Sequence, residues 1–243
     1  YQPVVRLETE EIVGFEALLR WNHPTLGLIE PDRFISIAEE TGMIVPIGRW
    51  VLNEASATVA RWHSAHPQHR NLSMAVNVSA RQIASAHLVS HVRDAILASG
   101  IEPASLVLEM TETSLIHDTT VAATRLKELN QLGVRLAIDD FGTGYSSLSY
   151  LRQFPVDILK IDRSFIGTIS DRAQVPAIVR GLLDLGRTLE LETIAEGVEL
   201  GAQRDQLVDE KCGYAQGYLF SRPLEAADAE KLLGRLTTRM AIP

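Results

Sequence analysis

The sequence has few residues of the kinds that stabilise secreted domains or cross membranes. It contains one cysteine, Cys212, so no internal disulfide can form and a reducing, cytoplasmic compartment is expected. No apolar run approaches the roughly 20 residues that a membrane-spanning helix needs, and no signal peptide is recognisable. Because the first residue is Tyr1 rather than Met, we interpret the chain as a fragment of a longer protein, whose other regions are open to carrying a membrane anchor.

Clustered cysteine and histidine ligands are also missing, which argues against structural zinc. His63, His66 and His69 have near-helical spacing, but Pro67 interrupts them, so we interpret them as a solvated helix end. The net charge is -8, whereas DNA and RNA polymers call for a basic surface, so no nucleic-acid polymer is expected as a partner. A small phosphorylated ligand stays compatible if metal ions or a few arginines supply positive charge locally.

Short apolar runs alternate with amphipathic stretches along the 243 residues, and this rhythm predicts a parallel sheet covered by helices. The predicted strands are 1–7, 12–19, 73–79, 106–110, 134–139, 156–162, 193–195 and 214–219. The predicted helices are 32–40, 47–63, 86–99, 119–132, 146–152, 174–189, 201–210 and 226–236, and residues 20–24 are expected to lead into a loop.

The first two strands are separated by a short turn, which only an antiparallel hairpin allows. With eight strands and a length typical of an α/β barrel, residues 1–243 are predicted to form one domain, a modified TIM-type (β/α)₈ barrel with one antiparallel strand. The alternative, an open doubly wound sheet, would carry a glycine-rich phosphate fingerprint after its first strand. No such fingerprint is present.

Polar residues lie within or at the C-terminal end of seven predicted strands. They are Glu16, Asn77, Glu109, Asp139, Asp140, Lys160, Glu196 and Gln216. Singly, each has an ordinary structural explanation, such as a helix cap for Asn77 or an arginine partner for Glu109. In an α/β barrel, however, these strand ends converge on one mouth where catalytic residues collect, so together they predict one site.

Asp139 and Asp140 end a short apolar run and precede Gly142-Thr143-Gly144. Two adjacent carboxylates at a buried strand end resist desolvation unless a cation is present, although a helix cap is the plain alternative. Oxygen ligands without histidine or cysteine favour Mg²⁺ or Mn²⁺. The donors outnumber the needs of one ion, so two are expected, about 3.5–4 Å apart in phosphodiester-hydrolysing sites. Lys160 would orient the attacking water or neutralise phosphoryl charge.

Seven motifs in chain order resemble those of the EAL-domain family, over residues 1 to about 233. They are Glu16-Ala17-Leu18-Leu19-Arg20, Asn77-Val78-Ser79, Glu109-Met110-Thr111-Glu112, Asp139-Asp140-Phe141-Gly142-Thr143-Gly144, Lys160-Ile161-Asp162, Glu196-Gly197-Val198-Glu199 and Gln216-Gly217-Tyr218-Leu219-Phe220. The family consists of bacterial signalling phosphodiesterases that open cyclic di-GMP to linear pGpG. The resemblance implies the same activity here, with two Mg²⁺ or Mn²⁺ ions as cofactors.

The resemblance also implies roles for individual residues. Metal ligands are implied at Glu16, Asn77, Glu109, Asp139 and Asp140. Catalytic roles are implied at Lys160, at Glu196 as general base or metal partner, and at Glu112, which would organise the loop after Asp140. Gln216 and Asp162 would support the metals, and substrate binding is implied at Gln2, Arg20, Glu199 and Tyr218. The structural alternatives for these last four are an edge-strand glutamine, a surface arginine, a helix-start carboxylate and a core tyrosine.

Three functions stay open at this point. The expected one is an enzyme, since none of the metal-ligand or loop motifs of active members is missing. The second is a receptor that binds cyclic di-GMP without cleaving it. The third is proton abstraction next to a carboxylate, since barrels with that chemistry also combine strand-end carboxylates, magnesium and a lysine. The resemblance further implies a homodimer and flanking sensory or cyclase-like domains.

Overall fold

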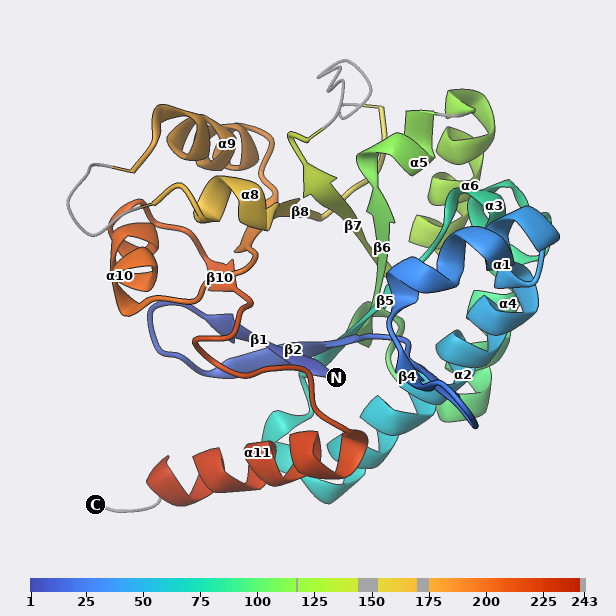
Figure 1. Cartoon of the computed structure of the whole chain (residues 1–243), viewed down its shortest axis with the longest axis horizontal. Coiled ribbons are helices and arrows are strands. Elements are labelled where there is room, and N and C mark those ends of the chain that lie inside the picture. Colours follow the sequence, from blue (N-terminus) through green and yellow to red (C-terminus); the bar gives the residue numbers. More distant parts are fainter. Residues whose placement is uncertain (117, 144–152, 170–174, 241–243) are drawn as a thin grey trace.

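Eight strands close into a barrel in the order β1-β10-β9-β8-β7-β6-β5-β2 (Figure 1). The computed structural model describes residues 1–116, 118–143, 153–169 and 175–240. The barrel strands are β1 (Gln2–Arg6), β2 (Ile12–Ala17), β5 (Ser73–Asn77), β6 (Leu106–Thr111), β7 (Arg135–Phe141), β8 (Ile158–Ile161), β9 (Glu192–Ala195) and β10 (Tyr214–Ala215). The predicted barrel is therefore confirmed.

The strand β1 is the one that runs against its neighbours in this barrel. It pairs antiparallel with both β2 and β10, whereas the other neighbouring pairs are parallel. The turn from β1 to β2 is too short for a crossover, and Glu10 adopts a left-handed conformation within it (φ 57°). As a result, the start of β1 lies at the same end of the barrel as the carboxyl ends of the other strands.

Helices surround the barrel on its outer side (Figure 1). The α-helices are α1 (Ile35–Thr41), α2 (Ile44–Ala65), α3 (Ala80–Ala84), α4 (Leu88–Ser99), α5 (Glu112–Ile116), α6 (Thr119–Gln131), α8 (Arg163–Ile166), α9 (Ala177–Thr188), α10 (Gly201–Asp209) and α11 (Ala226–Met240). The 3₁₀ helices are η1 (Pro31–Arg33), η2 (Pro67–His69) and η3 (Pro103–Ser105). Of the predicted helices, 146–152 lies outside the described residues. No described helix is both long and apolar enough to cross a membrane.

Some local predictions were wrong. The segment expected to lead into a loop forms a small antiparallel hairpin, β3 (Trp21–His23) and β4 (Gly27–Ile29). The last barrel strand stops at Ala215 rather than at 219, because the chain turns there and the Gly217 oxygen accepts hydrogen bonds from the amides of Phe220 and Ser221. The short helices α3, α5 and α8 were not predicted, since four or five residues show no helical period.

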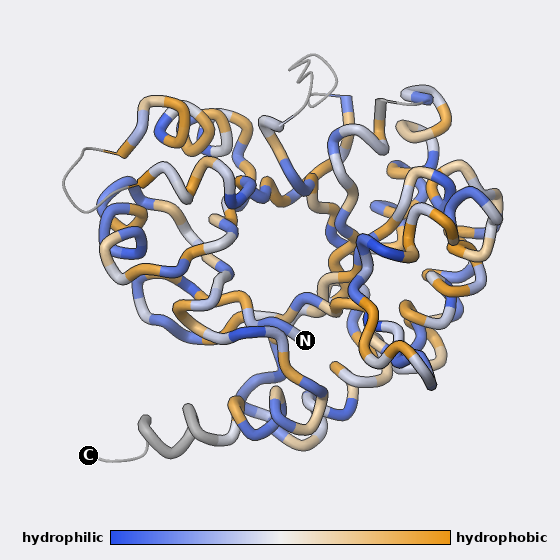
Figure 2. The backbone as a smooth tube through the Cα atoms, in the orientation of Figure 1, coloured by the Kyte–Doolittle hydropathy of each residue, from blue (hydrophilic) through white to orange (hydrophobic). Residues whose placement is uncertain are grey.

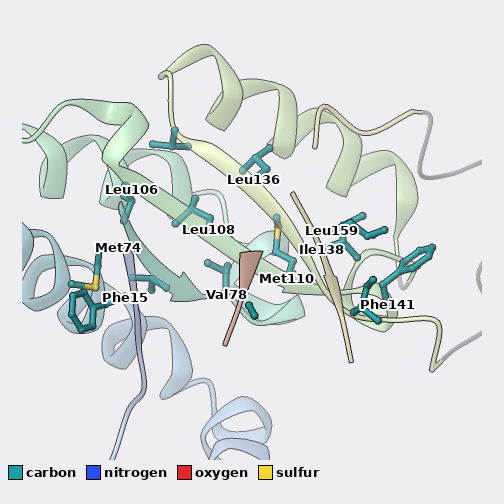
Figure 3. Close-up of a cluster of buried hydrophobic side chains, with 14 of the residues drawn as sticks. Phe15, Met74, Val78, Leu106, Leu108, Met110, Leu136, Ile138, Phe141 and Leu159 are labelled. Carbon is teal, nitrogen blue, oxygen red and sulfur yellow. The ribbon is translucent and has the colours of Figure 1, made fainter. Parts of the chain in front are cut away.

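Alternation along the strands divides the core into two parts. Outward-facing side chains such as Phe15, Leu108 and Leu159 belong to the main core between barrel and helices (Figure 3). Inside the barrel is a separate apolar layer, made of Val4, Ala75, Val107, Ala137, Ile158 and Ile194. Both hydrophobic and hydrophilic stretches occur around the ring of backbone (Figure 2).

The next inward-facing layer is polar. Moving two residues toward the mouth from each member of the apolar layer gives Gln2, Asn77, Glu109, Asp139, Lys160 and Glu196. Since side chains two positions apart on a strand share a face, the barrel aims all six toward its mouth. Polar residues that lie two positions beyond an apolar residue in different strands are therefore brought together at one site.

Candidate active site

Lys160 is the centre of the polar layer. Its side chain is fully buried, and its Nζ atom lies 2.8 Å from Glu109 Oε2 and 2.8 Å from Glu196 Oε1. Asp139 Oδ1 lies 3.4 Å from the same nitrogen, and Glu16 Oε2 lies 3.6 Å away. Residues from five strands or strand ends therefore meet at one ammonium group.

The negative charge around Lys160 exceeds what one ammonium can neutralise. Burial, together with repulsion from neighbouring carboxylates, raises the pKa of Glu109 well above its usual value. The same causes, burial first, raise the pKa of Glu196 to about 8. Burial opposes the charged form of Lys160, but the surrounding carboxylates, Glu109 foremost, raise its pKa well above the usual value. The cluster is short of positive charge while its lysine stays protonated.

Glu16 is held by side-chain amides on both of its oxygens. Asn77 Nδ2 donates to Oε1 at 2.7 Å, and Gln216 Nε2 donates to Oε2 at 2.7 Å. Gln216 Nε2 also lies 3.0 Å from Gln2 Oε1, and Gln2 Nε2 donates to the backbone oxygen of Ser221 at 3.1 Å. Burial alone would raise the pKa of Glu16, but the lysine charge and these amide donors lower it below the usual value. Glu16 is therefore a fixed carboxylate.

A bulge in β7 brings Asp139 and Asp140 to the same site. Asp140 has a left-handed backbone (φ 54°), and the pairing of β7 with β8 shifts register between Ile138 and Phe141. The Asp140 amide donates to Asp139 Oδ1 at 2.9 Å, and Thr143 Oγ1 donates to the Asp140 oxygen at 2.8 Å. In a regular strand these neighbours would face opposite sides. Here both contribute carboxylate oxygens to the mouth.

The carboxylates form two groups that share one residue. Glu16, Glu109 and Asp139 make one group, and Asp139, Asp140 and Glu196 make the other; within each, one oxygen per residue lies within 4.8 Å of the others. These donors are all oxygens and carry excess negative charge, which fits hard divalent cations. Within the described residues, the buried Gln216 Oε1 also has no hydrogen-bond donor, so this atom has an unused capacity to accept from or coordinate a partner.

Glu112, predicted to organise the loop after Asp140, and Asp162, predicted to support the metals, both have defined structural positions. Glu112 is buried and begins α5 directly after β6. Asp162 caps α8, because its carboxylate accepts from the Ser164 amide at 2.9 Å. Burial, then repulsion from Asp139 and from Asp162, raises the pKa of Asp140. Asp162 thus acts on the site through its charge as well as by starting a helix.

Of the four predicted substrate-binding residues, Gln2 lies within the buried polar layer. The other three, Arg20, Glu199 and Tyr218, lie outside it. Gln2 is part of the hydrogen-bond network around Glu16. Arg20 follows β2 at the rim and contacts Glu30, with 2.9 Å between Arg20 Nε and Glu30 Oε2. Glu199 is exposed just before α10. Tyr218 is 49% exposed, so the alternative of a core tyrosine is wrong.

Comparison with known proteins gives the family. A model of the EAL domain matches residues 1–223. The chain belongs to the EAL-domain family. It is 46% identical over 226 residues to the bifunctional diguanylate cyclase/cyclic di-GMP phosphodiesterase MucR of Pseudomonas aeruginosa, covering 93% of this chain and 33% of MucR. It is 44% identical over 233 residues to the cyclic di-GMP phosphodiesterase NbdA of the same organism, covering 96% of this chain and 30% of NbdA.

Solved structures agree with this membership. The PaMucR phosphodiesterase in complex with c-di-GMP matches with a TM-score of 0.89 and 45% identity, covering 94% of this chain and 92% of that one. The EAL enzyme Bd1971, bound to cAMP and cyclic-di-GMP, matches with a TM-score of 0.90 and 36% identity, covering 96% of this chain and 63% of that one. The present EAL domain spans about a third of the length of its curated relatives MucR and NbdA.

A cavity of about 640 Å³ opens beside the polar layer of this EAL domain, at Asn77. Asn77 forms part of its wall, and the rest is mostly apolar, including Leu18, Leu19, Ile35 and Ile47. Such a cavity, mostly apolar with some polar groups in its wall, is typical of a small-molecule site.

Two charged residues near the predicted substrate residues of this EAL domain, Glu30 and Arg222, were not predicted from the sequence. Glu30 pairs with Arg20, and the Arg222 guanidinium carbon lies 4.2 Å from the centroid of the Tyr218 ring. Neither is at the carboxyl end of a barrel strand, so the rule that identified the other site residues does not apply to them. The signal for Glu30 would have been a hairpin between residues 21 and 29, which was not predicted.

Proposed function

We propose that this EAL domain is a metal-dependent phosphodiesterase that hydrolyses cyclic di-GMP to linear pGpG. The observation that carries the proposal is the pair of carboxylate groups sharing Asp139 around a buried Lys160. The relatives MucR and NbdA are named as cyclic di-GMP phosphodiesterases, and the similar MucR structure contains c-di-GMP. Their activity supports the same activity here.

Two Mg²⁺ or Mn²⁺ ions would be held by the two carboxylate groups, with Asp139 common to both and Asn77 as a further oxygen donor. When bound, such ions lower the pKa of a water and stabilise the leaving oxygen of a phosphodiester. The donor set fits this role because it lacks nitrogen and sulfur ligands and is rich in negative charge.

The protein's own groups supply orientation and charge. Lys160 holds the carboxylates in place, and its buried protonated ammonium would offset negative charge that develops on the phosphoryl group. Glu196 lies at the edge of the cluster, 2.8 Å from Lys160 Nζ, and is the candidate to accept the proton of the attacking water or to help hold a metal ion. Asn77 and Gln216 fix Glu16, and the buried Glu112 would hold the loop that carries Asp140.

The substrate would be bound from the rim. The largely apolar cavity beside Asn77 suits a planar purine base, and Arg20 supplies positive charge for a phosphate. Exposed Tyr218 offers a ring for stacking, with Gln2 and Glu199 as further polar contacts. A dinucleotide with two purines and two phosphates matches this combination of features.

In the longer protein we propose that this domain is one module beside sensory or cyclase-like domains, is located in the cytoplasm and forms a homodimer. Sedimentation or light scattering would give its oligomeric state. Equal specific activity in verified monomers and dimers would count against a role of the dimer in catalysis.

The test is product analysis after incubating the chain with cyclic di-GMP and Mg²⁺ or Mn²⁺. Formation of pGpG, abolished by chelation and restored by metal, is the expected result. Binding of cyclic di-GMP without product would favour the alternative function, a silent receptor. Absence of both binding and product would contradict the proposal.

A further inference from the structure

One charged contact connects the rim of the mouth to the β3–β4 hairpin. Arg20 Nε lies 2.9 Å from Glu30 Oε2, and Arg20 Nη1 donates to the backbone oxygen of Leu19 at 2.9 Å. A guanidinium has five N–H donors in a rigid fork, so these two contacts leave donors for an anionic ligand. The contacts also restrict the directions in which those donors point.

The hairpin explains why Glu30 reaches Arg20. Trp21 pairs with Ile29 as the outermost pair of the β3–β4 register, so Arg20 and Glu30 are the next residues on the two strands. The Trp21 ring packs edge-on against Phe34, with 5.7 Å between ring centroids, and Phe34 immediately precedes α1. The hairpin is therefore anchored to the helical layer, and it carries Glu30 to a fixed place.

The side chain of Glu30 does not cap the helix that follows it. Glu30 occupies the N-cap position of η1, yet its side chain makes no capping hydrogen bond. Its carboxylate is directed to Arg20 instead, although the side chains of the pair are 60% and 28% exposed and such pairs contribute little to stability. A function in orienting Arg20 accounts for the contact better than stability does.

Arg20 lies where a substrate would arrive. It follows β2, the strand that carries Glu16, whose carboxylate accepts a hydrogen bond from Gln216 in the mouth. The neighbours of the pair in sequence, Leu19 and Pro31, line the cavity beside the polar layer. Arg20 and Glu30 are thus placed at the edge of both the cavity and the mouth.

We propose that Glu30 is a positioning residue that holds the Arg20 guanidinium in the orientation that binds a phosphate of the substrate. The proposal rests on the proposed function, because it requires a phosphodiester ligand at the mouth. Glu30 does not contact the substrate. It restricts Arg20 before binding, so less side-chain freedom is lost when the phosphate arrives.

Steady-state kinetics with cyclic di-GMP test the proposal. In Glu30→Ala we expect KM to rise about fivefold with kcat within about twofold, because Arg20 binds ground state and transition state alike. Arg20→Ala should raise KM further, about tenfold, by the same reasoning. The double variant should be no worse than Arg20→Ala, since Glu30 acts only through Arg20. Glu30→Asp should recover part of the loss.

The Arg204–Glu10 pair gives a matched control. Its N–O distance is also 2.9 Å, and its side chains are 33% and 54% exposed, but it joins the β1–β2 turn to α10 at the other end of the barrel. Glu10→Ala should therefore leave KM unchanged. Thermal unfolding of both glutamate variants should differ little from that of the wild type, which separates positioning from a general loss of structure.

An unchanged KM in Glu30→Ala would overturn the proposal. A lower KM would overturn it too, because it would mean that Glu30 competes with substrate for Arg20. Independent, multiplying effects of the two substitutions would show that Glu30 does not act through Arg20. If the wild-type chain neither binds nor hydrolyses cyclic di-GMP, the proposed function fails and this inference fails with it, whereas an active wild type with an insensitive Glu30→Ala contradicts the inference alone.

Discussion

The two ends of this barrel differ in the burial and the charge balance of their ionised side chains. The mouth is the end at the carboxyl ends of the parallel strands, and the base is the opposite end. At the mouth, one buried ammonium, Lys160, faces four carboxylates within 3.6 Å. At the base, Arg135 pairs with Glu192 at 2.7 Å, and the Arg6 guanidinium lies 5.2 Å from the centroid of the Tyr214 ring. At the base, each of these charges has one partner and is partly exposed to solvent. At the mouth, negative charges outnumber the positive one, and the ammonium is buried.

This difference separates charges that support the fold from charges that perform chemistry. A balanced, hydrated pair needs no further partner and contributes modestly to stability. A buried group of carboxylates with one lysine is costly unless cations bind, and such costs persist at functional sites. On these physical grounds, which do not depend on sequence similarity, the mouth is the end of the barrel that would gain from binding metal ions.

The largest effect should come from removing the central cation of the mouth. Lys160→Met leaves buried carboxylates without compensation, so the free energy of unfolding in chelator should fall by about 3–5 kcal/mol and hydrolysis should be lost. Arg135→Met at the base should cost less than about 1 kcal/mol. Denaturant unfolding of both variants measures the contrast, and equal losses would remove the distinction between the two ends.

Divalent ions should stabilise the mouth and leave the base unaffected. At a concentration 100 times Kd, Mg²⁺ or Mn²⁺ should add about 2.7 kcal/mol to the free energy of unfolding of the wild type. Asp139→Asn should lose most of this gain, because Asp139 belongs to both carboxylate groups. Glu192→Gln at the base should keep it. Thermal shift with and without metal checks the difference, and an equal shift in all three proteins would contradict it.

Without metal, stability should depend on pH through the mouth. The pKa of Glu196 is about 8 in the folded protein against 4.5 for an unperturbed glutamate, so between these values the native state holds a proton that the unfolded chain has released. Stability must then fall as pH rises, by up to about 1.4 kcal/mol per pH unit for one proton. Glu196→Gln should flatten this fall when unfolding is measured from pH 5 to 8. A slope identical to that of the wild type would contradict the assignment.

The smallest expected effect is on the chemical reactivity of the Cys212 thiol, which lies near the base of the barrel. Cys212 is buried, and burial raises its pKa to about 11, so almost no thiolate is available near neutral pH. Native protein at pH 7.5 should resist alkylation, whereas the unfolded chain should react at its single cysteine. Mass spectrometry after timed labelling checks this, and rapid native labelling would show that this end of the barrel opens.

Much of the site was predictable because the barrel has a simple geometry. Asn77, Glu109 and Lys160 each follow an apolar strand residue by two positions, and parallel strands bring such residues to one mouth. The sequence therefore predicted which strands carry the site. The distances from Lys160 to four carboxylates depend on the closed sheet and its register, which no local pattern specifies.

The orientation of Asp140 and the β3–β4 hairpin depend on local backbone geometry that no sequence pattern predicted. Asp140 faces the mouth because of a left-handed residue and a register shift, whereas alternation alone would turn it away. The β3–β4 hairpin was missed because its strands are three residues long and largely exposed, which hides the two-residue period. Missing the hairpin meant missing Glu30, since only the hairpin brings it to Arg20.

The central claim is that the carboxylate groups sharing Asp139 form the catalytic metal centre. Its most direct test is the rate of cyclic di-GMP hydrolysis with saturating Mg²⁺ or Mn²⁺, compared between wild type, Asp139→Asn and Asp184→Asn, whose aspartate instead pairs with Arg187 on the surface of α9. We expect pGpG formation by the wild type and Asp184→Asn, and loss of at least about 10²-fold in Asp139→Asn. Near wild-type turnover in a folded Asp139→Asn would contradict the account.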